Sequence, residues 1–194
     1  MMSTHMIKIL LKEYNSFQKL GLSSLISSQA ISKNRVVELL SPSSESEELA
    51  DILFHKNIVT VRLNKHPTNK KPKIYVPFLM RNKTVSEIST VIDKLLELAC
   101  IESRVFYCKD ELYMNLHLSG HMQISNMENN VMTLIGKGNS YASVAGLLNR
   151  SPKTISAHCR SITRKMGAAN RAEFFQYASF IAGCENEEKY DLCL

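Results

Sequence analysis

Apolar positions follow two different patterns along the chain. In roughly the first hundred residues, short apolar runs rich in β-branched side chains predict buried strands. These strands are expected at Met6–Lys12, Arg35–Leu40, Asn57–Leu63 and Ile74–Leu79. Helical patterns are expected from Ser16, over Glu47–Phe54 and behind the capping pattern Thr84-Val-Ser-Glu87. This alternation predicts an α/β domain over residues 1–100, with a mostly parallel sheet and helices on its faces.

The middle of the chain leads from this domain into a helical one. Arg104–Cys108 and Leu112–His117 flank a polar turn and predict a hairpin, and Ser119-Gly120 begins a linker, so residues 101–120 are interpreted as hairpin and linker. From residue 121 the apolar spacing becomes helical, which predicts an all-α four-helix domain over residues 121–183. Residues 184–194 are rich in acids and are expected to form an acidic tail.

Helix start signals are clear in the second domain. Ser125-Asn-Met-Glu128 is a capping box, Ser140 is a typical N-cap, and Ser151 caps a helix whose first residue is Pro152. The stretch from Ser140 to Cys159 therefore predicts a helix, a tight turn and a second helix.

The helix that begins at Pro152 has two opposite faces. Its apolar stripe has i, i+4, i+7, i+11 spacing and consists of Ile155, Cys159, Ile162 and Met166. The same spacing, about half a turn away, gives a basic face that consists of Lys153, Ala157, Arg160 and Arg164. One face needs a core, and the other suits a surface pressed into a DNA groove.

Charge supports an anionic partner for the helical domain. The whole chain has a formal charge of +6, and residues 119–182 alone carry a net charge of +5, whereas the last twelve residues carry −3. An apolar fraction of 44% is ample for folded cores. The positive charge therefore peaks where the helix-turn-helix pattern lies.

The cysteines and the apolar runs place the protein in the cytoplasm. The five cysteines are odd in number and form no CxxC pair, which fits a reducing compartment. No apolar run approaches the roughly 18–20 residues of a membrane span, so no membrane association is expected.

Cys159 lies on the apolar stripe and is interpreted as a core residue rather than a redox site. His117 and His121 have the spacing of metal ligands on a helix, but Gly120 lies between them, so no metal site is expected.

Residues Ile124–Ala178 resemble the LuxR/GerE-type helix-turn-helix domain over their whole length and without a gap. The motifs that carry the resemblance are Ile124-Ser-Asn-Met-Glu128, Gly138-Asn-Ser140, Val144-Ala-Gly-Leu-Leu148, Ser151-Pro-Lys-Thr-Ile155, Lys165-Met-Gly167 and Asn170-Arg-Ala-Glu173. One departure is Ser143, which replaces the usual acidic residue after the cap of the second helix. This departure does not fall on the expected DNA face.

The resemblance implies that the helix from Pro152 to Met166 lies in the major groove of double-stranded DNA. The positions that usually reach bases are Ser156, Ala157 and Arg160, with Arg160 suited to guanine. The positions expected to contact phosphates are Lys153, Thr154, His158, Arg164 and Lys165. The alternative interpretation is that these residues are the solvated face of an ordinary helical bundle.

The last helix of the domain is unusually aromatic. Phe174, Phe175 and Tyr177 exceed what a short helix needs for its own core, and such helices commonly dimerise in this family. The sequence leaves open whether these residues form core or a dimer surface.

The N-terminal domain resembles a response-regulator receiver domain, but a degenerate one. Receivers hold Mg²⁺ with two acids after the first strand, where this chain has only Glu13, and they accept phosphate on an Asp at the end of the third strand, where counting gives Arg62. Glu13 and Arg62 are expected to form a salt bridge in this vestigial pocket. The alternative is an unrelated small α/β domain. The autoinducer-binding domain that commonly accompanies this DNA module in the family is rejected, because such a domain is larger than the roughly 120 residues before the module and usually has tryptophan in its ligand pocket, whereas this chain has no Trp; no small-molecule ligand is therefore expected.

The combined interpretation is a sequence-specific DNA-binding transcription regulator that does not depend on phosphorylation. It resembles accessory regulators of capsule or fimbrial systems and is expected to act as a homodimer or with a partner response regulator. The alternative is a protein-interaction module that heterodimerises with or sequesters another regulator without binding DNA tightly. No nucleophile–base pair or phosphate loop appears, so neither an enzymatic activity nor a cofactor is expected.

Overall fold

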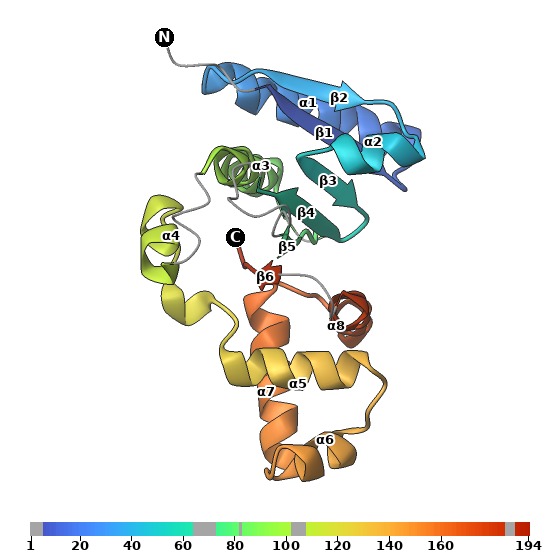
Figure 1. The fold of residues 1–194 in the computed structure, drawn as a ribbon, viewed down its shortest axis with the longest axis vertical. Coiled ribbons are helices and arrows are strands. Elements are labelled where there is room, and N and C mark those ends of the chain that lie inside the picture. Colours follow the sequence, from blue (N-terminus) through green and yellow to red (C-terminus); the bar gives the residue numbers. More distant parts are fainter. Residues whose placement is uncertain (1–5, 64–72, 82, 102–107, 185–188) are drawn as a thin grey trace.

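The N-terminal half of the protein is built on one six-stranded sheet (Figure 1). The structure is a computed structural model that describes residues 6–63, 73–81, 83–101, 108–184 and 189–194. The strands are β1 (Ile7–Lys12), β2 (Val37–Leu40), β3 (Ile52–His55), β4 (Ile58–Arg62), β5 (Lys73–Pro77) and β6 (Lys189–Asp191). Their spatial order is β2-β1-β3-β4-β5-β6.

The sheet is mixed, with three parallel and two antiparallel pairings, so the expectation of a mostly parallel sheet is only partly confirmed. Strand β1 pairs parallel with β2 and β3, but β4 pairs antiparallel with both β3 and β5. The cause is a two-residue turn, Lys56-Asn57, that joins β3 directly to β4, with Lys56 at φ 51°. A turn this short allows only antiparallel pairing, whereas a parallel neighbour needs a long crossover.

Strand β3 was not predicted, because its residues were assigned to a helix over Glu47–Phe54. The helix α2 (Ser44–Leu49) ends before Ala50, and Ile52 and Phe54 then alternate into the core as strand residues. Four residues are too few to distinguish a strand from one helical turn by periodicity.

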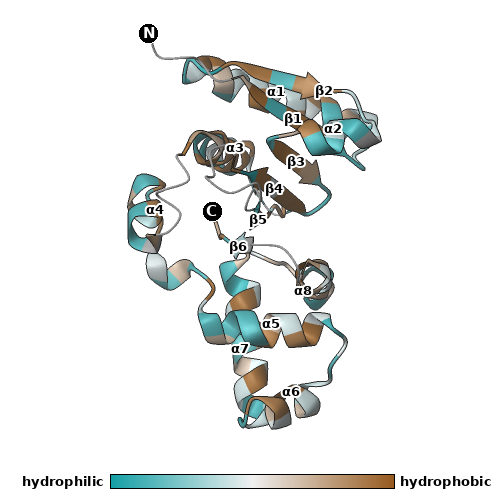
Figure 2. Cartoon of the chain, viewed as in Figure 1, coloured by the Kyte–Doolittle hydropathy of each residue, from teal (hydrophilic) through white to brown (hydrophobic). Residues whose placement is uncertain are grey.

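One face of the sheet is covered by helices α1 (Ser16–Ser32) and α3 (Val85–Cys100). Asn15 caps α1, rather than Ser16, and the predicted capping box of Thr84 and Glu87 is confirmed at α3. Buried side chains from both helices pack onto strands β1, β3, β4 and β5. Figure 2 shows β1, β3 and β4 as largely hydrophobic ribbons. This core includes Leu22, Ile26, Ile92 and Leu95 from the helices and Ile9, Phe54, Val59, Val61 and Val76 from the strands.

The predicted hairpin of residues 104–117 is wrong in its second half, which forms helix α4 (Lys109–Asn115). Leu112 and Leu116 are buried in the core of the sheet, at i, i+4 spacing. The first half of the predicted hairpin lies outside the described residues except for Cys108. The run from Leu112 has no β-branched residue, which favours helix over strand.

The C-terminal half is helical. Its elements are the short 3₁₀ helix η2 (Gly120–Met122) and the helices α5 (Asn126–Gly136), α6 (Tyr141–Leu147), α7 (Pro152–Lys165) and α8 (Arg171–Gly183). The predicted N-caps Ser125, Ser140, Ser151 and Asn170 are confirmed, because each side chain accepts a hydrogen bond from a backbone N–H in the first turn. At α6, Ser143 takes part in the cap as well, with its hydroxyl 2.9 Å from that of Ser140.

Helices α5 and α8 pack very closely at Gly136. A Cβ atom at this position would lie 2.0 Å from the carbonyl oxygen of Ala178, which is far inside van der Waals contact. Gly136 is therefore required for the approach of the two helices, and not only as the end of α5.

Helix α8 joins the two halves of the protein by covering the second face of β4 and β5. Tyr75 of β5 alternates away from the first core and packs against Phe180 of α8, with ring centroids 5.3 Å apart. The Tyr177 hydroxyl lies 3.3 Å from the Tyr75 carbonyl oxygen and 3.1 Å from a carboxylate oxygen of Asp191. The helical domain is thus docked on the sheet (Figure 1).

The segment expected to be an acidic tail returns to the sheet as β6. Strand β6 pairs parallel with β5, and Leu192 is buried in the first core while Cys193 is buried in the second. The Gln123 side chain forms two hydrogen bonds with the Cys193 backbone. Its amide N–H donates to the Cys193 carbonyl oxygen at 2.8 Å, and its amide oxygen accepts from the Cys193 N–H at 2.9 Å. In sequence, the helical domain therefore lies between β5 and β6, which are neighbouring strands of one sheet.

Candidate nucleic-acid interface

Helix α7 is fixed by local sequence and held by its apolar stripe. Ser151 accepts a hydrogen bond from the Thr154 N–H at 3.1 Å, and Pro152 occupies the first helical position, where it removes no needed donor. The predicted stripe of Ile155, Cys159, Ile162 and Met166 is buried, with no side chain more than 5% exposed. Burial raises the pKa of the Cys159 thiol, so this residue is a protonated core side chain, as predicted.

The opposite face of α7 is open. Lys153, Ala157, Arg160 and Arg164 are all exposed, which confirms the two-faced helix. A shallow groove of about 390 Å³ runs along this face and is lined by Ala157, Arg160, Ser161 and Arg164. The predicted residues Thr154, Ser156 and His158 have intermediate exposure.

Arg160 is oriented by its neighbour one turn earlier. Its guanidinium donates a hydrogen bond to the Ser156 hydroxyl at 3.0 Å, so two of the three predicted base-reading residues act as a pair. The guanidinium keeps further donors for a bidentate partner.

Lys165 is not a surface residue, so its expected phosphate contact is wrong. Its side chain is 11% exposed, and its ammonium lies 2.7 Å from a Glu128 carboxylate oxygen and 2.7 Å from the Gln123 carbonyl oxygen. Burial alone would raise the pKa of Glu128, but hydrogen bonds from Lys165, Ser125 and Ser161 lower it to about 2. Lys165 therefore ties the end of α7 to the start of α5.

Two of the three aromatic residues considered for a dimer surface pack within the chain. Phe174 is 1% exposed and Tyr177 is 3% exposed, and Tyr177 lies against the sheet. Of the two alternatives that the sequence leaves open, these two residues are therefore core. Phe175 is partly exposed.

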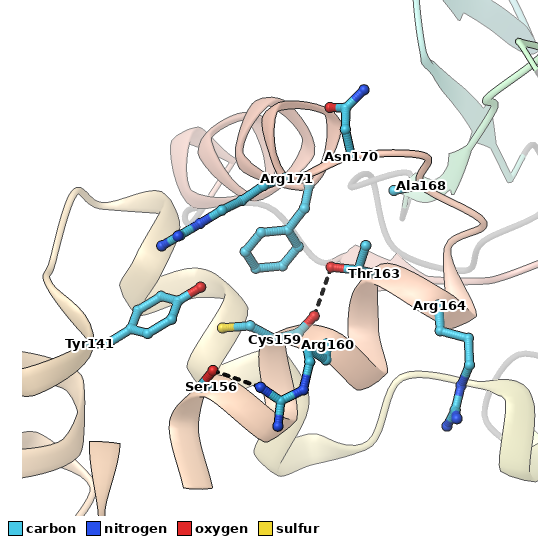
Figure 3. Close-up of a pocket in the computed structure, with 10 residues that line it drawn as sticks. Tyr141, Ser156, Cys159, Arg160, Thr163, Arg164, Ala168, Asn170 and Arg171 are labelled. Carbon is cyan, nitrogen blue, oxygen red and sulfur yellow. Dashed lines mark hydrogen bonds between the residues drawn. The ribbon is translucent and has the colours of Figure 1, made fainter. Parts of the chain in front are cut away.

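A second groove, of about 550 Å³, lies on the other flank of α7 (Figure 3). Its walls come from α7, from the first turn of α6 and from the first turn of α8. Arg171 extends across it, with its guanidinium carbon 4.9 Å from the ring centre of Tyr141. Sequence reasoning missed both residues, because Arg171 was assigned only to the capping motif of α8.

The expected salt bridge between Glu13 and Arg62 does not form, because the two residues lie at opposite ends of the strands of the sheet. Strand β4 runs antiparallel to β3, which itself runs parallel to β1, so Arg62 at the end of β4 lies far from the residue after β1. Arg62 instead donates to the Glu48 carbonyl oxygen. Counting along the sequence placed Arg62 at the end of the third strand of the expected parallel sheet. The third parallel strand is instead β3, which ends at His55.

Glu13 is held by the turn that follows β3. Its carboxylate lies 2.8 Å from the Lys56 ammonium and 3.1 Å from His55 Nε2. Hydrogen bonds from Lys56 and then His55 lower the pKa of Glu13 to about 2. The third parallel strand thus ends in a histidine beside the acid, where a receiver has its phosphorylated Asp.

The helices from η2 to α8 form a helix-turn-helix class of domain, with α7 as the exposed second helix. Residues 122–178 match the GerE family model, described as bacterial regulatory proteins of the luxR family. The matched segment spans less than a third of the chain, and it supports a LuxR-family regulator with a DNA-binding module. No curated protein matches the chain.

Among the described residues, no helix is both long and apolar enough to span a membrane. Nor do these residues contain a group of three or more His, Cys, Asp or Glu side chains placed to hold a metal ion.

Proposed function

We propose that this chain is a sequence-specific DNA-binding transcription regulator whose helix α7 enters the major groove. The observation that carries the proposal is the exposed face of Lys153, Ala157, Arg160 and Arg164 on a helix whose other face is fully buried. A helix of 14 residues is about 21 Å long, which suffices to cross the groove and contact both strands.

The roles of the side chains follow from their positions on α7. Arg160 donates to the acceptor pair of a guanine, Ala157 contacts a thymine methyl group, and Ser156 orients Arg160 as well as contacting a base. Lys153 and Arg164, at the two ends of the face, contact phosphates. Thr154 and His158 have the same role at the borders of the face.

The test is selection of bound duplexes from a randomised DNA library by the full chain, followed by titrations with the best site. Arg160→Ala is expected to weaken specific binding by about 1–3 kcal/mol and to relax one base position. Lys19→Gln on α1, which removes one charge from the distant end of the molecule, is the matched control. A wild-type chain that enriches no sequence would refute the proposal and favour the interaction-module alternative.

We also propose that regulation does not use phosphorylation. The support is the replacement of the receiver acids by a neutralised cluster, in which Glu13 is engaged by His55 and Lys56. The intact mass of the protein is expected to stay unchanged after incubation with acetyl phosphate and Mg²⁺. An added phosphate on Asp51, or on any other N-terminal residue, would contradict this.

Pairing is the third part of the proposal. Sites for helix-turn-helix proteins often contain two half-sites one turn apart, which calls for two copies or for a copy and a partner regulator. The surface available for a second copy includes Phe175 on α8, and also Phe17 and Leu20 on α1, which are 88% and 72% exposed. Sedimentation of the wild type, Phe175→Ser and Phe17→Ser is expected to show a dimer that one substitution dissociates. A wild type that stays monomeric on its best DNA site contradicts pairing.

A further inference from the structure

The groove between α7, α6 and α8 has an arginine rim and an apolar floor (Figure 3). The rim is formed by Arg160, Arg164 and Arg171, and the floor includes the rings of Tyr141 and Phe174. The ten residues that line this groove include no carboxylate. Such a surface suits a ligand that combines negative charge with an apolar face.

The arginine side chains of the rim keep their charge available. Across the described part of the chain, none of the three forms an ion pair with an acid. Arg171 is held between two rings, 4.9 Å from the centre of Tyr141 and 5.1 Å from the centre of Phe175. Stacking fixes the plane of the guanidinium but leaves the N–H groups at its edge to donate to an anion.

The position of the groove identifies the anion. Arg160 and Arg164 line both this groove and the shallow groove of the exposed face, so they form the ridge between the two. A helix about 10–12 Å across fills a major groove about 12 Å wide, so a sugar–phosphate backbone must pass along each flank. With the exposed face of α7 against the bases, the groove beside Arg171 faces one of these backbones.

We propose that this groove is a DNA-backbone subsite, in which Arg171 binds a phosphate and the Tyr141 ring contacts the adjoining deoxyribose. The inference rests on the proposed function, which it extends to residues outside α7. Arg171 contributes affinity and fixes the orientation of α7, and it does not read sequence, because phosphates are the same at every base pair.

The experiment measures the salt dependence of binding to the selected site with the full chain. Loss of one phosphate contact reduces the magnitude of the negative slope of log K against log salt by about 0.9. If the affinities of variant and wild type are equal at 1 M salt, this corresponds to about eightfold weaker binding at 0.1 M salt and about twofold weaker binding at 0.5 M. We expect this result for Arg171→Gln. Arg171→Lys should keep the wild-type slope because it keeps the charge, and Lys19→Gln should match the wild type.

A second measurement changes the DNA instead of the protein, so its first arm uses only the wild type and does not depend on the folding of a variant. Neutral methylphosphonates are placed one at a time along both strands, and the wild type should lose affinity at a phosphate that flanks the bases read by α7. Arg171→Gln should not respond at that phosphate, while it should respond as the wild type does at all others.

The outcomes separate the two proposals. One outcome is selective DNA binding that depends on Arg160, while Arg171→Gln keeps the wild-type salt slope and responds to the same methylphosphonates as the wild type. This outcome would overturn the subsite alone, and the groove would then suit an acidic protein partner instead. Absence of selective binding by the wild type would overturn both.

Discussion

Replacing Lys165 with Met tests whether this lysine holds the fold or binds DNA. The substitution keeps most of the side-chain volume but removes the ammonium that lies 2.7 Å from Glu128. The Glu128 side chain is only 6% exposed, so its carboxylate would remain buried without its main partner.

The magnitude follows from the pKa of Glu128. The gap between its ordinary value of 4.5 and about 2 in the folded protein corresponds to about 3 kcal/mol, at 1.36 kcal/mol per pKa unit. Because the folded pKa is lowered, this stabilisation is present above pH 4.5 and is lost as the pH falls toward 2. Hydrogen bonds from Ser125 and Ser161 share this gap with Lys165, so we expect Lys165→Met to cost up to about 3 kcal/mol near neutral pH and less than half as much at about pH 3.

The assay is urea unfolding followed by circular dichroism, at both pH values. Lys153→Met is the matched control, since it removes a lysine from the exposed face of the same helix and should change stability by less than about 0.5 kcal/mol. The double variant Lys165→Met with Glu128→Gln should recover part of the loss, because the amide of Gln can still cap the Ser125 N–H. A Lys165→Met variant with wild-type stability, but with a salt slope of DNA binding lower by about one, would refute the buried pair.

Three other predictions concern single residues. Lys153→Ala should weaken binding to all DNA sequences alike and lower the salt slope by about 0.9; a changed site preference with the wild-type slope would contradict a phosphate role. Gly136→Ala should destabilise the protein by about 1–3 kcal/mol in urea unfolding, since its Cβ would overlap the Ala178 carbonyl, and Gly146→Ala on α6, with nothing within 4 Å of its Cβ, is the control. Tyr177→Phe should cost about 1–2 kcal/mol by removing a buried hydroxyl that lies 3.3 Å from the Tyr75 carbonyl oxygen and 3.1 Å from an Asp191 carboxylate oxygen; a variant as stable as the wild type would show that these contacts contribute nothing net.

Local signals in the sequence determined the helical domain almost completely. The caps at Ser125, Ser140 and Ser151 act within four residues, and the apolar stripe of α7 depends only on helical periodicity. These features are encoded by near neighbours, so the exposed basic face of α7 could be predicted residue by residue. The match of residues 122–178 to the luxR family model agrees with the same motifs.

Only the tertiary structure decided the arrangement of the sheet and the partners of its edges. The pairing of β4 with β3 depends on a two-residue turn with no Gly to mark it, and β6 pairs with β5 more than a hundred residues earlier in the chain. Pairing partners in a sheet are set by long-range packing, which leaves little trace in local periodicity.

The same limit explains which site residues were misplaced. Lys165 and Arg164 are adjacent in sequence and alike in charge, but one faces Glu128 of α5 and the other faces solvent. For Tyr177, the choice between core and dimer surface was decided only by the packing of the sheet against α8. The sequence determines which faces of each helix are apolar or charged, whereas the packing of the helices on one another and on the sheet determines which of those faces remain available for DNA.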